Sequence, residues 1–95
     1  MMTKLIRPEN ILPDNESSKI IDGIHVRKGT IGAVLANAKT LTLSASTPLE
    51  KQAALEIIKE LAPALVVLGV HDYIQWKNAE IQQIVEEAAR ALNRL

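Results

Sequence analysis

The stretch ALVVLGV, from Ala64 to Val70, decides between two fold classes for this chain of 95 residues. It directly follows Pro63 and contains no polar side chain. A run this short is typical of a buried helical segment that kinks at Pro63 and stops at Gly69, and equally of a fully buried strand. We predict the helix, since the strand would require a sheet that the rest of the chain supports poorly.

The residues before this stretch carry a strong helix start signal. Thr47 suits the N-cap position, Pro48 the first helical position, and Glu50 the third, from which its carboxylate can reach back to the cap. The apolar residues that follow recur at helical spacing, and Leu55 falls outside their face. That face comprises Ala53, Ala54, Ile57, Ile58 and Leu61. We therefore predict a helix over 48–68.

The C-terminal segment is the best-specified element of the sequence. Asn78 suits an N-cap, Glu80 lies in the electropositive first turn, and Arg90 and Arg94 lie near the electronegative end. One apolar stripe runs along it, and it comprises Ile81, Ile84, Val85, Ala88 and Leu92. These signals agree on a helix over 78–94.

The first half of the chain predicts a hairpin and one more helix. Asp22-Gly23 lies between β-branched residues and supplies the positive φ values of a two-residue turn, so we expect a hairpin over about 18–28. A helix over 30–42 follows, with Thr30 as its candidate cap. Its expected apolar face comprises Ile31, Val34, Leu35, Ala38 and Leu41. Residues 1–18 are rich in proline, asparagine and serine and are expected to form an arm or loop.

Two folds fit these elements. The first is a mainly α fold, a small bundle of three to four helices with a short N-terminal β-hairpin, in which 19–95 form a single globular domain. The alternative is an α/β fold with a three-stranded parallel sheet, in which 40–45 and 64–70 are strands, because leucines alternate with Thr40, Thr42 and Ser44. Such a thin sheet would leave exposed edges, so we predict the helical bundle.

Composition excludes several functional classes. Lys and Arg together number 11, as do Asp and Glu, so the net charge is zero and offers no electrostatic case for nucleic acid or anionic lipid. There is no cysteine and there are two histidines, so we expect neither a metal site nor a cofactor. The longest apolar run, 61–70, is about half of what a bilayer crossing needs. With no signal-peptide pattern at the start, we expect a cytoplasmic protein without a membrane segment.

One candidate binding region surrounds the glycines that precede the helix over 30–42. Backbone N–H groups there can bind a phosphate, with Arg27, Lys28 and Thr30 as further ligand-binding candidates. The residue order of a phosphate-binding P-loop is absent. The structural explanation is that Gly29 ends the hairpin and Gly32 lets the helix pack closely.

A second candidate region comprises His71, Asp72, Tyr73 and Trp76. An imidazole beside a carboxylate can act as an oriented base, but no nucleophile accompanies the pair at a recognisable spacing, and no catalytic residue is identified. The structural explanation is a turn between helices, with Tyr73 and Trp76 covering the edge of the core and keeping their polar atoms in water.

Three functions are compatible with the sequence. The first is a noncatalytic protein-interaction or assembly module, a homodimer through apolar helix faces in which alanines permit close approach. The alternative is a small-molecule-binding domain or small enzyme using the region 71–76. Nucleic-acid binding through Arg27 and Lys28 ranks last, because the chain is uncharged overall and has only one Tyr and one Trp.

Overall fold

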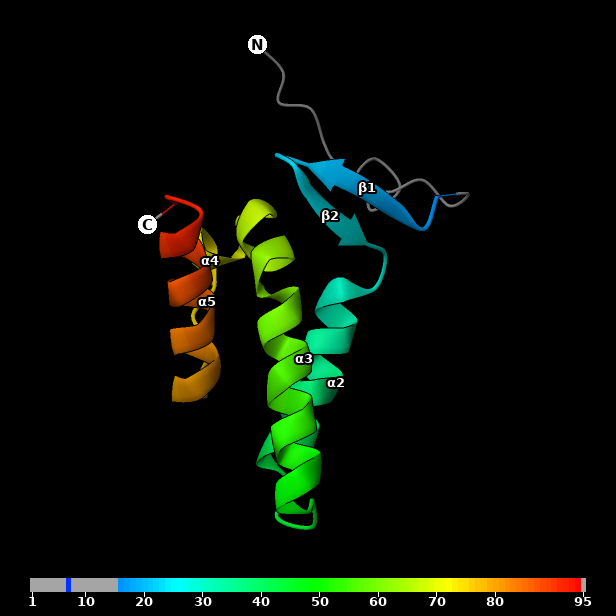
Figure 1. Ribbon diagram of the computed structural model, residues 1–95, viewed down its shortest axis with the longest axis vertical. Coiled ribbons are helices and arrows are strands. Elements are labelled where there is room, and N and C mark those ends of the chain that lie inside the picture. The colour runs from blue at the N-terminus through cyan, green and yellow to red at the C-terminus, as the bar shows by residue number, and fades with distance from the viewer. Residues whose placement is uncertain (1–6, 8–15, 95) are drawn as a thin grey trace.

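The computed structural model describes Arg7 and residues 16–94. The elements in this part of the chain are the strands β1 (Ser18–Ile21) and β2 (Ile24–Arg27) and the helices α2 (Thr30–Thr42), α3 (Pro48–Val67), α4 (Val70–Tyr73) and α5 (Ala79–Ala91). They confirm the mainly α fold with a short N-terminal hairpin (Figure 1). The predicted arm over 1–18 lies outside the described residues except for Arg7 and 16–18, of which Ser18 already belongs to β1.

The hairpin forms around the predicted turn. Asp22 and Gly23 adopt φ values of 49° and 80°, which bring the strands together in an antiparallel pair. Lys19 pairs with Val26, and the Val26 side chain is buried against the helices. Ile20 pairs with His25 on the opposite face of the ribbon, where both are exposed. The two-stranded hairpin therefore depends on the helices for its apolar contacts.

Helix α2 has the predicted bounds, but its N-cap residue and its buried side differ from those expected. Gly29 is the N-cap, in the left-handed conformation, and Thr30 is the first helical residue instead of the cap. Val34 is fully buried, whereas Ile31 and Leu35 remain 44% and 48% exposed, so the expected apolar face is only partly buried. The buried side is rotated toward Thr30 because α3 is the main neighbour of α2.

The strand alternative over 40–45 is wrong. Thr40 and Thr42 belong to α2, and their hydroxyls donate to carbonyl oxygens one turn earlier, at 3.4 and 2.9 Å. Because the helix itself provides these acceptors, the alternating threonines do not require a strand. Leu41 packs against the core as a partly buried residue, while Leu43 lies beyond the helix and is exposed.

Helix α3 begins with the predicted capping box and continues through Pro63 to Val67, so the strand alternative over 64–70 is wrong as well. The Thr47 hydroxyl accepts from the Glu50 N–H at 3.1 Å, and the Glu50 carboxylate accepts from the Thr47 N–H at 2.8 Å. The bond from the Thr47 backbone N–H to the carboxylate, together with a hydrogen bond from the Thr47 side chain, holds the pKa of Glu50 below its ordinary value. Gly69, with φ of 89°, then turns the chain into α4.

The run from Ala62 to Val66 is buried because α3 is the central helix. It packs against α2, α5, α4 and β2, so this segment meets neighbours on most of its sides. A proline inside a helix removes one backbone hydrogen bond and costs about 3 kcal/mol. Burial of the adjacent apolar side chains, including the fully buried Leu65 and Val66, offsets that cost.

Helix α5 starts as predicted and ends earlier than predicted. The Asn78 side chain accepts from the Ile81 N–H at 3.0 Å. At the other end Asn93 adopts a φ of 57°, and the Arg94 N–H donates to the Ala89 carbonyl oxygen at 2.7 Å. This left-handed cap ends the helix at Ala91, not at 94.

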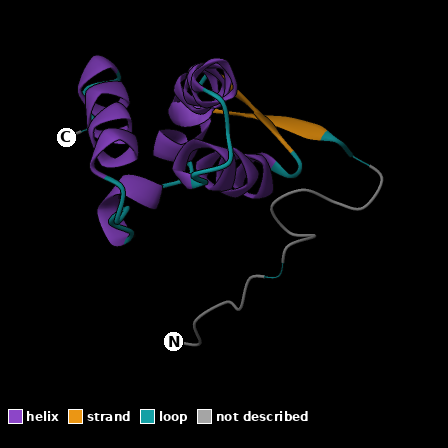
Figure 2. Cartoon of the chain, turned by 90° about the horizontal axis from the view of Figure 1, so that it is seen from below, coloured by secondary structure: helices purple, strands orange, loops and turns teal. Residues whose placement is uncertain are grey.

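The core lies where α2 and α5 meet α3. Its large buried side chains are Val34, Ile58, Leu65, Val66, Ile81 and Val85. Figure 2 shows the long helices packed together and the hairpin extending to one side of them. Among the described helices, none is both long enough and apolar enough to cross a lipid bilayer.

Candidate functional site

The second candidate region of the sequence lies on α4 and on the segment that joins α4 to α5. The His71 side chain is only 6% exposed, and its Nε2 lies 3.2 Å from the Arg94 carbonyl oxygen and 3.5 Å from Asp72 Oδ1. Both neighbours are acceptors, so Nε2 carries the proton. His71 Nδ1 is buried and has no hydrogen-bond partner in the described part of the protein. The imidazole ties α4 to the end of α5 and is largely buried.

Arg94 extends this connection to the hairpin. Its guanidinium lies 2.8 Å from the carboxylate of Asp22, in the turn between β1 and β2. Three segments that are distant in the sequence thus meet at the C-terminal end of α5. Both side chains of the ion pair are about half exposed. The pair therefore holds the turn beside α5 but contributes little to the stability of the fold.

The two aromatic residues of the region have different surroundings. Trp76 packs against the core, and its indole N–H is buried without a hydrogen-bond partner among the described residues. It covers the edge of the core as expected, but its polar atom is not in water. Tyr73 is 90% exposed and covers nothing, because it ends the single turn of α4 and faces solvent.

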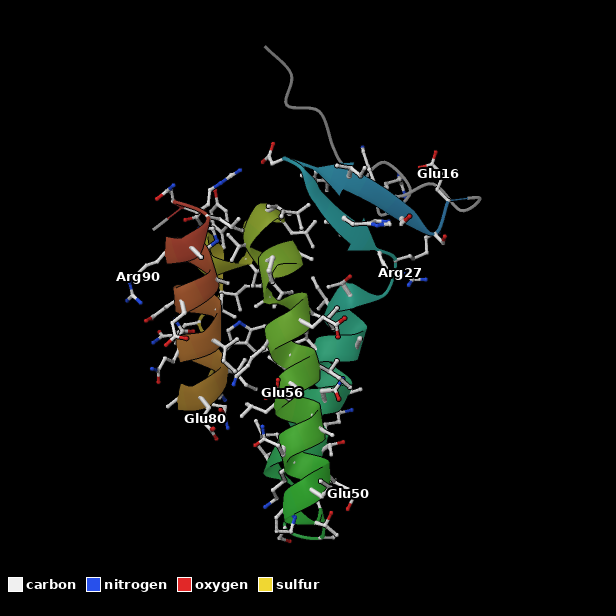
Figure 3. The ribbon with its side chains drawn as sticks, viewed as in Figure 1. Glu16, Arg27, Glu50, Glu56, Glu80 and Arg90 are labelled. Atoms are coloured by element: carbon white, nitrogen blue, oxygen red, sulfur yellow. The ribbon has the colours of Figure 1, made fainter. Side chains whose placement is uncertain are left out.

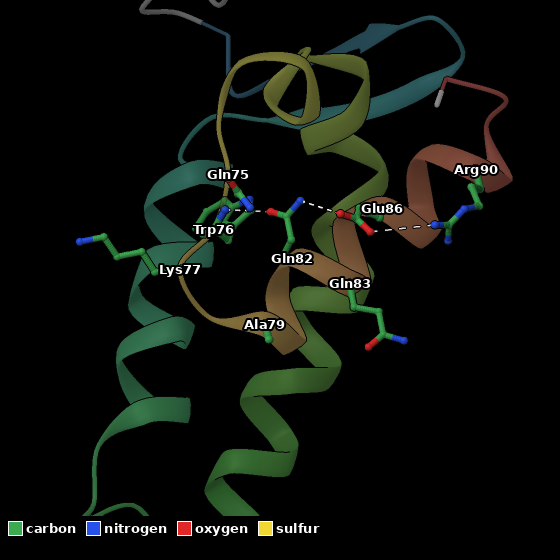
Figure 4. Close-up of a pocket in the computed structure, with 8 residues that line it drawn as sticks. All are labelled: Gln75, Trp76, Lys77, Ala79, Gln82, Gln83, Glu86 and Arg90. Atoms are coloured by element: carbon green, nitrogen blue, oxygen red, sulfur yellow. Dashed lines mark hydrogen bonds and ion pairs between the residues drawn. The ribbon is translucent and has the colours of Figure 1, made fainter.

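Beside Trp76 lies an open groove of about 500 Å³, which we call the tryptophan groove (Figure 4). The chain before α5 and its first residue contribute Gln75, Trp76, Lys77 and Ala79. Helix α5 contributes Gln82, Gln83, Glu86 and Arg90. The sequence alone did not single out Gln75, Lys77, Ala79, Gln82, Gln83 or Glu86, although Gln82, Glu86 and Arg90 follow one another at i, i+4 spacing.

A chain of polar contacts organises this groove. The Trp76 backbone N–H donates to Gln82 Oε1 at 2.8 Å, and Gln82 Nε2 donates to Glu86 Oε1 at 2.9 Å. Arg90 Nη2 lies 3.9 Å from the second oxygen of Glu86. The groove therefore presents amides and charges that can hydrogen-bond a polar ligand.

The first candidate region is not part of this site. Figure 3 shows Arg27 and Arg90 on opposite sides of the molecule. The Thr30 side chain is buried, and its hydroxyl donates to the Arg27 carbonyl oxygen at 2.6 Å. The hydroxyl hydrogen is therefore already used and is not offered to a ligand. Arg27 and Lys28 are both exposed at the end of the hairpin. The structure thus leaves the two groups of candidate residues apart.

Gly32 does not have the role that the sequence indicated. A Cβ atom built on Gly32 would meet no heavy atom within 4 Å, so no packing contact of α2 requires a glycine there. Gly29, by contrast, adopts a φ of 86°, which favours glycine.

Across the described residues, no group of three or more His, Cys, Asp or Glu side chains is placed to hold a metal ion. No protein-family model matches the chain, and neither the curated proteins nor the solved structures searched contain a significant match.

Proposed function

We propose that the chain is a noncatalytic assembly module in which helix α2 binds the α2 of a second copy. The observation that carries this proposal is the solvent-facing side of α2. Five exposed residues there are apolar or glycine, and we call them the α2 outer face: Ile31, Gly32, Ala33, Leu35 and Ala36.

The α2 outer face differs from the exposed sides of the other long helices. Lys39, in the last turn, is the one charged residue of α2. Helices α3 and α5 carry several exposed charges, among them Glu56, Lys59, Glu87 and Arg90. A helix side that faces only water normally carries polar residues. The scarcity of charge on the exposed side of α2, where Lys39 is the one charged residue, therefore supports contact with another protein surface.

The sizes of these side chains suit a second helix. Gly32 and Ala36 lie one turn apart and would let a helix backbone approach closely. Ile31 and Leu35, exposed by 44% and 48%, would supply apolar area to bury beside them. Gly32 costs the helix about 1 kcal/mol relative to alanine, and no contact among the described residues requires it. A close helix contact would account for this glycine.

A second copy is the partner that this surface suits best. In a twofold contact the same residues serve on both sides, so one apolar face is sufficient, with Lys39 at its C-terminal end. The net charge of zero means that the two copies do not repel one another over long distances. A chain of this size also buries a smaller share of its surface than a large domain, and dimer formation would bury more.

Sedimentation velocity of the full chain, from low to high micromolar concentration, tests this proposal. We expect a monomer–dimer equilibrium for the natural sequence and a monomer for Leu35→Glu, because a charge cannot be buried in the contact without a partner. Leu49→Glu is the matched control, since Leu49 is 80% exposed at the start of α3. A natural chain that stays monomeric throughout, or a Leu35→Glu variant that still dimerises, contradicts the proposal.

A second candidate function, binding of a small polar molecule, rests on the tryptophan groove and its contacts around Gln82. A ligand bound there should raise the melting temperature in a thermal-shift screen of polar metabolites, and Gln82→Ala should abolish that rise. Gln52→Ala is the control, because Gln52 likewise donates to a glutamate one turn later, Glu56, at 2.9 Å, but lies outside the groove. A screen without any shift counts against this function.

A further inference from the structure

A second groove lies between α3 and α5, away from the contact between α3 and α2. It has a volume of about 240 Å³, and we call it the α3–α5 groove. Its lining consists of Leu55 and Lys59 from α3 and of Glu80, Gln83, Ile84 and Glu87 from α5. Neither the α2 outer face nor Trp76 contributes to it.

The floor of the groove is apolar. Leu55 and Ile84 are both half-buried, so each still presents apolar surface to a side chain that enters. Leu55 stands outside the apolar stripe that packs α3 into the core, and packing of the core does not account for a leucine at this position. A role as the floor of a docking groove does account for it.

The rim of the groove is acidic. Glu80, Ile84 and Glu87 lie on one side of α5 at i, i+4 and i+7, so the two exposed carboxylates flank the isoleucine. Neither carboxylate forms an ion pair within the described residues, and Glu87 accepts only from Gln83 Nε2 at 3.1 Å. The single cation of the rim, Lys59, lies 3.7 Å from Glu56, which offsets its charge.

We infer that the α3–α5 groove binds an amphipathic helix of another protein, in which an apolar side chain lies between two Lys or Arg residues seven positions apart. Seven residues of helix span about 10 Å, which is the separation of the Glu80 and Glu87 backbones along α5. A partner helix along α5 would therefore place one cation at each carboxylate while its central side chain contacts Leu55 and Ile84. Charge complementarity selects a basic helix over a neutral one.

The experiment titrates a blocked synthetic peptide into the ¹⁵N-labelled full chain and follows amide chemical shifts. The peptide carries leucines between two lysines seven residues apart, and a control peptide has glutamate in place of both lysines. We expect shifts concentrated at Leu55, Gln83 and Ile84, and only with the lysine peptide. Added salt should weaken the binding, because exposed ion pairs are screened.

Charge reversal on the chain supplies the second measurement. The double variant Glu80→Lys, Glu87→Lys should weaken binding of the lysine peptide by at least about tenfold. Each attraction between Glu and Lys is replaced by a repulsion between two lysines. The matched control reverses Glu16 and Glu60, which are exposed outside the groove, and changes the net charge equally.

The inference is overturned by any of three results. These are equal binding of the two peptides, an unchanged affinity in the Glu80, Glu87 double variant, or shifts concentrated at Ile31 and Leu35 on the α2 outer face. Because the titration reports each surface separately, it stands whether or not the chain forms the proposed dimer.

Discussion

Replacing Gly32 with alanine should stabilise the single chain. The backbone of Gly32 is helical and not left-handed, and a Cβ at this position meets no heavy atom within 4 Å, so the added methyl causes neither strain nor a clash. The gain comes from the smaller conformational entropy that alanine loses on folding, about 0.5–1 kcal/mol in a helix. For a domain of this size, a gain of 1 kcal/mol corresponds to a rise in melting temperature of roughly 4–8 °C.

The assay is urea unfolding followed by far-ultraviolet circular dichroism, at a concentration low enough to keep the chain monomeric. The midpoint should rise without a change in the slope of free energy against urea, since the surface exposed on unfolding is nearly the same. Gly23→Ala is the matched control. Gly23 has equally open surroundings, but its φ of 80° makes an alanine there cost about 1–2 kcal/mol.

A lower midpoint for Gly32→Ala in the dilute monomer would refute this reasoning, because it would mean that some group of the same chain approaches Gly32 closely. An unchanged midpoint for Gly23→Ala would refute the part that concerns backbone conformation. The two variants together separate helix propensity from left-handed strain, since neither replaces an existing side-chain contact.

Four further predictions concern the cap of α3, the ion pair at the end of α5 and the core. Thr47→Ala should cost about 1 kcal/mol by removing the α3 N-cap. The lowered pKa of Glu50 means that its carboxylate stabilises the fold at neutral pH and loses this effect as pH falls through the lowered value. The difference in stability between Glu50→Gln and the natural chain should therefore narrow as the pH falls below 4.5, the ordinary pKa of a glutamate. A double-mutant cycle on Asp22→Asn and Arg94→Gln should give a coupling of about 0.2–1 kcal/mol that decreases with salt. Ile58→Ala, at a fully buried position, should cost about 2–5 kcal/mol in urea unfolding.

Two variants at exposed positions serve as controls for the losses of stability. Ser44→Ala, at an exposed loop position, should leave stability within about 0.5 kcal/mol, as should Leu43→Ala, where the side chain is 55% exposed. A stability difference for Glu50→Gln that stays constant with pH would contradict the role of the carboxylate. A coupling between Asp22 and Arg94 that does not respond to salt would contradict an exposed ion pair.

The hairpin turn and the starts of α3 and α5 were predictable because their causes are local. Asp22 and Gly23 carry the positive φ values of the turn themselves. Thr47 and Asn78 each bond a backbone N–H three residues later. Interactions across so few residues follow from the order of residues alone.

The environment of the candidate residues was not predictable in the same way. The His71 side chain is largely buried, and its Nε2 lies beside the Arg94 carbonyl oxygen, 23 residues later in the chain. The tryptophan groove exists because the chain after α4 places Trp76 beside α5. There the Gln82 side chain accepts a hydrogen bond from the Trp76 backbone N–H. Nothing within a few residues of either position indicates these contacts.

For this protein the sequence by itself determined the type and start of most elements, since capping, turn chemistry and apolar spacing act within one or two turns of the chain. Only the tertiary structure decided which apolar residues are buried. Leu65 and Leu35 both follow helical spacing, yet Leu65 lies on the central helix among several neighbours, and Leu35 lies on the open side of α2. Burial depends on what packs against a side chain. The α2 outer face could therefore be identified only from the structure, in which these residues are exposed.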